Sequence, residues 1–199
     1  MKYFIKKIYL ILFFITALLY NTESFSKNVK FKYSQGDISN YFSGIVSVNQ
    51  NYTTTGFKYL NKVRFLKNSH YNFNVQFIRT LILLEKFEKA FAFSKNIWKE
   101  DELFFEADLL LLLESIKNQN YQKSNFYVNK LKDYKDQGTF EFVISSILEE
   151  YVYLFNNKKI KSSFEENEFG TFTLINRAFQ NCYLGTSNTD SYFKNIINF

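Results

Sequence analysis

A small residue returns every 34 positions in the first part of this sequence, among much larger neighbours. The three residues are Gly56, Ala90 and Ser124, and Ala90 lies in the run EKFEKAFAFSKNIW among three phenylalanines and a tryptophan. A fixed interval of this length indicates a repeat, in which one supersecondary unit stacks on the next. Because the small side chain recurs at one place in the unit, we expect the backbone there to press against a neighbouring helix.

From Ser39 onward, apolar residues recur with helical spacing, and the predicted helices come in pairs. The first three pairs are expected over 39–51 and 54–66, over 72–85 and 86–98, and over 103–117 and 121–132. Further helices are expected over 138–155, 171–185 and 187–199. The chain has no proline and only 6 Gly, which favours helices joined by short polar turns over a turn-rich β-sandwich. The predicted fold class is all-α.

The three pairs align when each is taken as a 34-residue unit, with the units beginning at Asp37, Tyr71 and Phe105. The eighth position of the unit holds Gly44, Ile78 and Leu112, the twentieth Gly56, Ala90 and Ser124, the twenty-third Tyr59, Phe93 and Tyr127, and the twenty-seventh Val63, Ile97 and Leu131. With these residues the stretch 37–135 resembles the tetratricopeptide repeat family, whose unit is two antiparallel helices. The resemblance implies helix-turn-helix repeats stacked as a right-handed α-solenoid. It also implies that the small residues Gly44, Gly56, Ala90 and Ser124 let paired helices approach closely.

The match departs from the family pattern at several positions. Asn40 and Ser43 stand where tryptophan and leucine are expected in the first unit, and the closing proline is absent throughout. A generic α-helical solenoid or an irregular helical bundle would share part of the pattern, and both stay open as alternatives.

The first 26 residues read as a leader. A basic start, MKYFIKK, precedes 13 uncharged and mostly apolar residues, and NTESFS ends in a possible cleavage site. Thirteen residues suit a signal peptide and fall short of the roughly 20 that a spanning helix needs. An uncleaved N-terminal membrane anchor is the alternative. We therefore expect an exported protein, periplasmic or associated with the cell envelope, whose membrane contact is confined to this segment if it is uncleaved.

Residues 136–199 are expected to hold further helical units with a polar linker near 156–170. The apolar periodicity continues to Phe199 without a polar cap. A solenoid normally ends in a unit with a polar outer face. The sequence is thus also compatible with a truncated piece of a longer array.

Residues for chemistry are scarce. His70 and Cys182 are the only histidine and cysteine, and we expect a turn histidine and a core cysteine. No glycine-rich phosphate loop and no cluster of metal ligands is present, so we predict no catalytic residues, no metal site and no cofactor. The net charge is +6, but the charges alternate along helix faces and form no basic stripe, so we expect no nucleic-acid partner. The run LLLLL at 109–113 covers a whole helix circumference, which indicates a buried helix.

The resemblance also implies where a ligand would bind. In this family the first helices of the pairs line a concave groove, and its contact positions carry over to twelve residues here. They are Tyr41, Phe42, Ile45, Asn49, Asn72, Val75, Gln76, Arg79, Glu106, Leu109, Leu113 and Lys117. The set that clamps a peptide carboxylate in some members is not reproduced. An apolar groove with Arg79 as its central cation remains, and it suits an amphipathic helix or an extended apolar peptide.

The sequence thus favours a non-enzymatic protein–protein interaction scaffold of the bacterial cell envelope, which binds a protein or peptide partner in this groove. The alternative is the structural N-terminal portion of a larger helical-repeat envelope assembly. Trp98, late in its helix, is expected to pack between repeats.

Overall fold

The computed structural model of the protein describes residues 33–136, 139–161 and 169–197. The chain divides into two units, Met1–Ser34 and Gln35–Phe199, and the helices described below all belong to the second. The expected signal peptide or anchor over 1–26 lies outside the described residues. None of the helices described has the length and apolar character needed to cross a bilayer.

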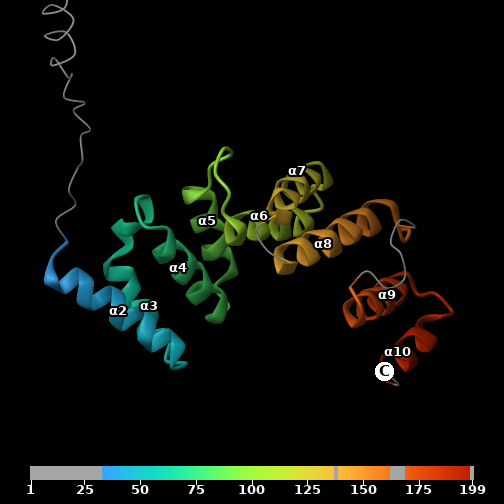
Figure 1. The fold of residues 1–199 in the computed structure, drawn as a ribbon, viewed down its shortest axis with the longest axis horizontal. Helices are drawn as coiled ribbons and strands as arrows, with labels where there is room; N and C mark the ends of the chain where they lie inside the picture. The colour runs from blue at the N-terminus through green and yellow to red at the C-terminus, as the bar shows by residue number, and fades with distance from the viewer. Residues whose placement is uncertain (1–32, 137–138, 162–168, 198–199) are drawn as a thin grey trace, which may run out of the picture. The chain divides into compact units, whose positions relative to one another are not determined.

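Nine α-helices and two short 3-10 helices, with no strand, make up the described part of the chain (Figure 1). They are α2 (Gln35–Asn49), α3 (Thr53–Lys62), η1 (Arg64–Asn68), α4 (Tyr71–Leu83), α5 (Phe87–Ile97), α6 (Phe105–Lys117), α7 (Tyr121–Lys132), η2 (Asp133–Asp136), α8 (Thr139–Asn157), α9 (Thr171–Leu184) and α10 (Thr189–Ile197). The all-α prediction is confirmed, and each of the nine expected ranges coincides with one α-helix. One difference is at 54–66, where α3 ends at Lys62 and η1 continues.

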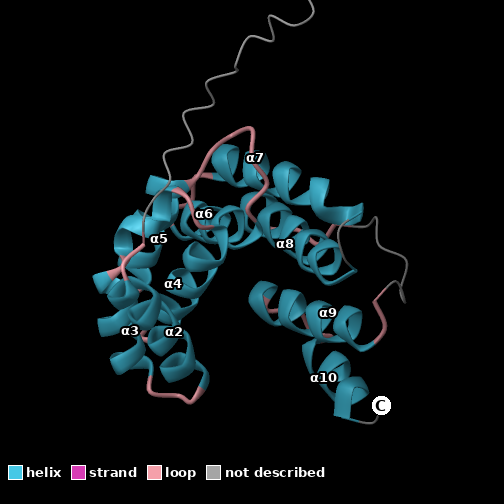
Figure 2. Ribbon diagram, turned by 60° about the vertical axis from the view of Figure 1, so that its left-hand side comes forward, coloured by secondary structure: helices cyan, strands magenta, loops and turns pink. Residues whose placement is uncertain are grey.

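Each helix packs against the helix that follows it along the chain, as Figure 1 and Figure 2 show. The first three pairs are α2 with α3, α4 with α5, and α6 with α7. Their second helices begin at Thr53, Phe87 and Tyr121, and α4 and α6 begin at Tyr71 and Phe105. Both sets of starts are spaced by 34 residues. The interval of the small residues is therefore also the interval of the helices.

The turn inside each pair repeats as well. Asn51, Glu85 and Gln119 adopt the left-handed backbone conformation, with φ of 64°, 55° and 54°. The next amide donates to the carbonyl five residues back, at 2.8, 2.9 and 2.9 Å in the three turns. This bond closes a helix end in a Schellman motif, where the left-handed residue is usually glycine. Gly185 forms the same turn between α9 and α10, so these two helices pair in the same way.

Two glycines allow α2 and α3 to lie close together. A Cβ atom on Gly56 would lie 2.4 Å from Cγ2 of Val48 and 2.9 Å from the carbonyl oxygen of Gly44. A Cβ atom on Gly44 would lie 2.6 Å from Cγ of Leu60. Carbon atoms normally rest at about 3.5–4.0 Å, so a side chain at either position would force the helices apart.

The equivalent positions of the next two pairs are Ala90 and Ser124, and both are fully buried. The Ser124 hydroxyl in α7 lies 2.9 Å from the hydroxyl of Ser115 in α6, and the two share a hydrogen bond. This bond joins the second helix of the pair to the first at the place where the first pair has glycine.

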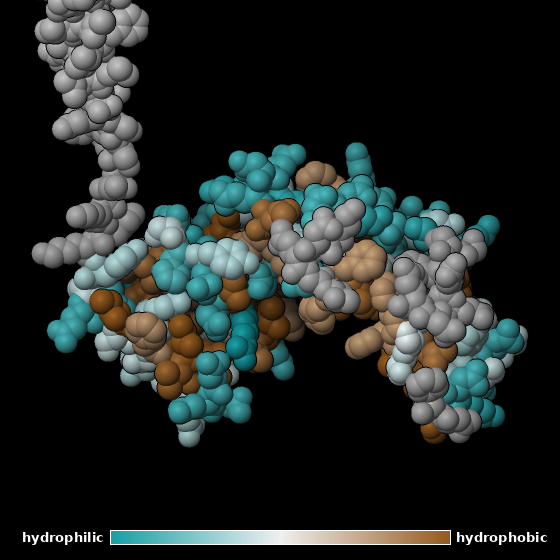
Figure 3. Space-filling view, in the orientation of Figure 1, coloured by the Kyte–Doolittle hydropathy of each residue, from teal (hydrophilic) through white to brown (hydrophobic). Residues whose placement is uncertain are grey.

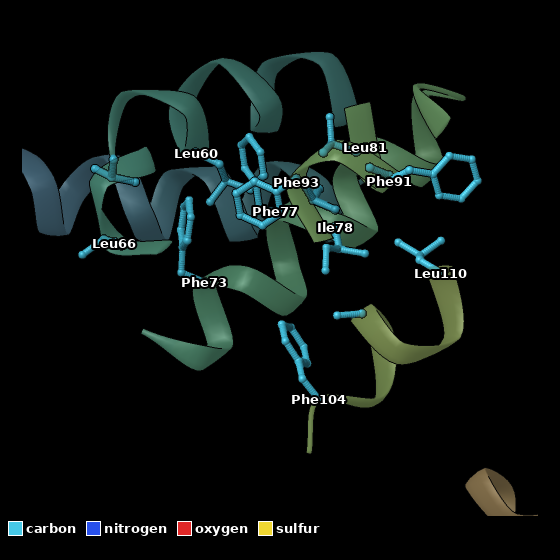
Figure 4. Packing of buried hydrophobic residues seen from close by; sticks show 14 residues of the cluster. Leu60, Leu66, Phe73, Phe77, Ile78, Leu81, Phe91, Phe93, Phe104 and Leu110 are labelled. Carbon is cyan, nitrogen blue, oxygen red and sulfur yellow. The ribbon is translucent and has the colours of Figure 1, made fainter. Parts of the chain in front are cut away.

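A core of phenylalanine and aliphatic residues fills the space from α2 to α6 (Figure 4). The rings of Phe73 and Phe77 stack with centroids 5.4 Å apart, and Phe77 meets Phe93 of α5 at 4.7 Å. A second cluster joins α6, α7 and α8. It contains Leu112, Val128, Leu131, Tyr134 and Val152. Aromatic rings bury large areas, so these contacts supply much of the hydrophobic stabilisation.

A buried carboxylate ties the second pair to the third. Asp108 of α6 is fully buried, and it accepts hydrogen bonds from Nε1 of Trp98 and from the hydroxyl of Tyr134, both at 2.6 Å. Lys130 of α7 lies 3.9 Å from this carboxylate and 4.6 Å above the Trp98 ring. Lys130 also donates to the carbonyls of Lys99 and Glu100. The contacts confirm that Trp98 packs between repeats, on the rings of α7.

The junction between α8 and α9 is polar. Glu150 of α8 is buried and accepts hydrogen bonds from the side-chain amides of Asn176 and Gln180 of α9. Two amide donors compensate this buried charge, as buried polar groups require. The expected linker near 156–170 begins where α8 ends at Asn157, and its residues 162–168 lie outside the described part.

Replacing Gly56 with alanine should destabilise the protein by about 1–3 kcal/mol, because the new methyl group meets Val48 and the backbone of α2. The free energy of unfolding in urea, followed by circular dichroism, measures the loss. Thr55→Ala, at an exposed position of the same helix, should change it by no more than about 0.5 kcal/mol. A Gly56→Ala protein as stable as the wild type would contradict the close approach.

Replacing Tyr134 with phenylalanine should cost about 1.5–3 kcal/mol, because the change removes a hydrogen bond to a buried carboxylate. Burial and the hydrogen bond to Asp108 hold the pKa of Tyr134 well above its ordinary value. The folded state therefore keeps a proton that the unfolded chain releases above about pH 10, and stability falls as the pH rises through that range.

The pH dependence gives the sharper test of the same contact. Urea unfolding between pH 8 and pH 11, as approximate limits around the tyrosine pKa, should show a shallower alkaline loss for Tyr134→Phe than for the wild type. Tyr153→Phe, at an exposed position of α8, should follow the wild-type curve. Equal slopes for Tyr134→Phe and the wild type would contradict the proton retention.

Candidate functional site

An apolar pocket of about 410 Å³ lies between α4, α5 and α6. It is lined by Val75, Ile78, Arg79, Ile82, Leu83, Phe87, Phe91, Glu106, Leu109, Leu110 and Leu113. Its volume falls within the range of natural ligand pockets, which are mostly apolar with a few placed polar groups. Hydrophobic side chains also reach the surface over the first two helix pairs, shown in brown in Figure 3.

The leucine run of α6 supplies one wall of this pocket. Leu110, Leu111 and Leu112 are buried in the core, whereas Leu113 is 40% exposed and Leu109 is half-buried. The expectation that this helix is buried all round is therefore wrong. Neighbouring helices cover only part of its circumference, and the remaining leucines face the pocket.

Two charged residues line the pocket among the apolar ones. Arg79 of α4 is exposed, and its guanidinium donates to Oδ1 of Asn49 at 3.3 Å. Glu106 of α6 is half-buried and receives a hydrogen bond from the Tyr71 hydroxyl. Burial raises the pKa of Glu106 above its ordinary value. A cation and a carboxylate therefore stand at the edge of an otherwise apolar surface.

One oxygen of Glu106 has no partner among the described residues. Oε2 is buried and makes no hydrogen bond to them. A buried polar atom normally finds a partner, because leaving it unpaired costs free energy. Because Glu106 also lines the pocket, this oxygen is the candidate acceptor for a hydrogen bond there.

Five of the twelve expected groove residues line this pocket, namely Val75, Arg79, Glu106, Leu109 and Leu113. The other seven are placed elsewhere, although two of them contact the pocket residues. Asn49 accepts from Arg79, and Lys117 lies 5.7 Å from the ring of Phe91 while it pairs with Glu88 at 2.5 Å.

The remaining five lie on α2 and in the first half of α4. The Tyr41 ring lies 5.0 Å from that of His70, Phe42 is 59% exposed, and Ile45 is half-buried. Asn72 is exposed, and Gln76 has a buried Oε1 without a partner among the described residues.

Sequence reasoning missed the part of the pocket that comes from the turn between α4 and α5. Ile82, Leu83 and Phe87 are 37%, 52% and 47% exposed around that turn, and Phe91 follows in α5. The positions carried over from the family lie on first helices only. A signal was available, because ILLEKF places apolar residues on both sides of a turn that leaves them uncovered.

The histidine and the cysteine have structural surroundings. His70 Nδ1 accepts from the Phe73 amide at 3.1 Å and caps α4, which confirms the expected turn histidine. Cys182 is exposed, so the expected core position is wrong, because α9 turns its polar residues towards α8 instead. Within the described ranges no group of three or more His, Cys, Asp or Glu side chains could hold a metal ion.

Comparison of the chain with protein-family models, with curated proteins and with solved structures gives no match.

Replacing Glu106 with glutamine should raise the free energy of unfolding at neutral pH, because it removes a charge from a site whose burial disfavours ionisation. Because the pKa of Glu106 is raised in the folded protein, its ionisation destabilises the wild type above that pKa. This destabilisation vanishes below the pKa that the residue has in the unfolded chain. The gain should therefore be seen in urea at about pH 8 and shrink towards about pH 4.

The matched control lies two turns along the same helix. Glu114 has Lys95 as a partner at 2.6 Å, so Glu114→Gln removes an ion pair and should bring no gain at either pH. A Glu106→Gln protein no more stable than the wild type at the higher pH would show that the buried oxygen is solvated or paired.

Proposed function

We propose that the protein is a non-enzymatic protein–protein interaction scaffold, built of tetratricopeptide-like helix pairs stacked as a right-handed α-solenoid. The equal spacing of the second helices' starts and of the left-handed turns in three consecutive pairs supports the stacking. The sequential packing of helices supports it too, since repeat arrays contact mainly their neighbours.

The observation that carries the binding function is the apolar pocket between α4, α5 and α6. Val75, Leu109 and Leu113 offer contact to apolar side chains of a peptide or amphipathic helix. Oε2 of Glu106 is an acceptor without a partner among the described residues, and Arg79 provides an exposed cation at the same surface. The partner we expect has two or more apolar side chains on one face and a hydrogen-bond donor that reaches Glu106.

The proposed site of action is the cell envelope or periplasm of a bacterium. The basic and apolar leader over 1–26 supports export. The same leader would be the point of membrane contact if it stays attached as an anchor.

A second candidate function is a structural part of a larger helical-repeat envelope assembly. The observation that favours it is the apolar surface of α9 and α10, where Phe172, Phe179 and Ile197 are 61%, 54% and 82% exposed. Exposed apolar surface of this kind marks an interaction site in many proteins. Further helical units would cover it by stacking.

Capture of partners from an envelope extract, followed by titration of the purified partner, tests the groove. The full chain should bind, and Leu113→Ser should weaken the affinity about tenfold or more, because the leucine contributes apolar area to the pocket. Leu103→Ser is the matched control. Leu103 is also 40% exposed but does not line the pocket. The affinity of the Leu103→Ser protein for the partner should therefore stay within about twofold of the wild type.

A partner that binds wild type and Leu113→Ser equally would exclude this pocket as its site. If Phe172→Ser abolishes the same binding, the assembly function is favoured instead. If Leu113→Ser weakens binding and Phe172→Ser does not, the result supports the groove as the binding site.

A further inference from the structure

A second pocket, of about 440 Å³, lies between α3, η1, α4 and α5. It is lined by Phe57, Asn61, Arg64, Phe77, Leu81, Lys89 and Ala92. None of these residues lines the apolar pocket described above. The two pockets are therefore separate, and a ligand of the second would bind whether or not the protein is a peptide-binding scaffold.

One side of this pocket is aromatic and aliphatic. Phe77 and Leu81 of α4 are each only 2% exposed, so they form part of the core and of the pocket wall at once. The half-buried ring of Phe57 lies 5.8 Å from that of Phe77. Such a surface favours contact with a flat apolar group.

The other lining residues carry positive charge. The Arg64 guanidinium lies over the rings of Phe77 and Phe93, at 5.7 and 5.9 Å from their centroids. Lys89 lines the pocket as well, and Lys86 lies 4.5 Å above the Phe57 ring. Of the described residues that line the pocket, none carries a carboxylate. The rings hold the Arg64 guanidinium in place, which lowers the entropy cost of using it for binding.

The basic residues that line this pocket have no carboxylate partner among the described residues, whereas several other lysines do. Lysines on α5, α6 and α7 form ion pairs with neighbouring acids. These pairs are Lys95 with Glu114, Lys117 with Glu88, and Lys132 with Glu149. Over the same described ranges, Arg64 and Lys89 form no ion pair. Their charge can therefore meet an anion in the pocket.

The repeat explains why this pocket exists. Arg64 follows α3 at the position that Trp98 holds after α5, 34 residues later. There the indole packs edge-on against Phe126 and Tyr127 of α7, at 6.2 and 5.8 Å. In the first interface a guanidinium stands in place of that ring. Space that one interface fills with an aromatic side chain is open and positively charged in the other.

We propose that this pocket binds a small aromatic carboxylate. The ring of the ligand lies against the half-buried ring of Phe57, and its carboxylate accepts two parallel hydrogen bonds from Arg64, with Lys89 nearby. The pocket volume is within the range for small-molecule sites, and the apolar wall explains why a ring is required in addition to the charge.

The test is an NMR titration of the isotope-labelled full chain with phenylacetate as the probe. Saturable shifts are expected at the amides of Asn61, Lys89 and Ala92. Phenylacetamide has the ring without the charge, and acetate has the charge without the ring, so each should bind about tenfold more weakly or worse. Equal binding of either control compound, or no shift with phenylacetate, would overturn the proposal.

Variants locate the site independently. Arg64→Gln should weaken phenylacetate binding about tenfold or more, and Arg64→Trp should abolish it by filling the pocket as Trp98 fills the next interface. Lys89→Gln changes an exposed position and leaves the core untouched, so it tests the site even if an Arg64 variant fails to fold. It should also weaken phenylacetate binding. Arg79→Gln, in the other pocket, should leave the affinity unchanged. Unchanged affinity in a folded Arg64→Trp protein would place the probe elsewhere and exclude this pocket.

Discussion

The turn inside each helix pair is the constraint on which the rest of the structure depends. Asn51, Glu85 and Gln119 hold a left-handed conformation that side chains other than glycine adopt at a cost. The hydrogen bond across each turn fixes where the second helix begins, two residues later. Its fourth residue is then the small one, directed at the first helix. Close packing at Gly56 thus follows from the turn, and the 34-residue interval reflects both.

The buried carboxylate of Asp108 adds specificity that apolar packing alone does not provide. An unpaired buried charge would cost several kcal/mol, roughly, so its partners must be in place for the fold to persist. Those partners come from three parts of the chain, namely Trp98 after α5, Lys130 in α7 and Tyr134 in η2. The observed arrangement of the second and third pairs satisfies all of them. The third pair is therefore fixed by hydrogen bonds as well as by its leucines.

Helical periodicity predicted the helices, because it depends on neighbours three or four residues apart. The 34-residue interval also placed Gly56 correctly at a crowded position, since a small residue recurs at one place in a repeat where two helices approach closely. Periodicity says which faces are apolar but not which neighbour covers them. For that reason the exposure of Leu113 and Cys182 could not be read from the sequence, and neither could the pairing of Glu150 with α9. The two pockets could not be predicted either, because they too depend on which neighbouring helix covers each face.

Helix α4 shows how two unlike pockets arise from one repeated frame. Val75, Arg79 and Ile82 lie along one side of it and line the apolar pocket, whereas Phe77 and Leu81, one turn apart, line the basic one. Both sides are apolar at the core, so the chemical difference comes from residues outside α4. Leucines of α6 complete the first pocket, and Arg64 and Lys89 complete the second. The repeated helix pairs therefore supply similar walls, and the residues that complete each pocket decide its charge. Arg64, which lines the basic pocket, stands where Trp98 packs against Phe126 and Tyr127 in the next interface.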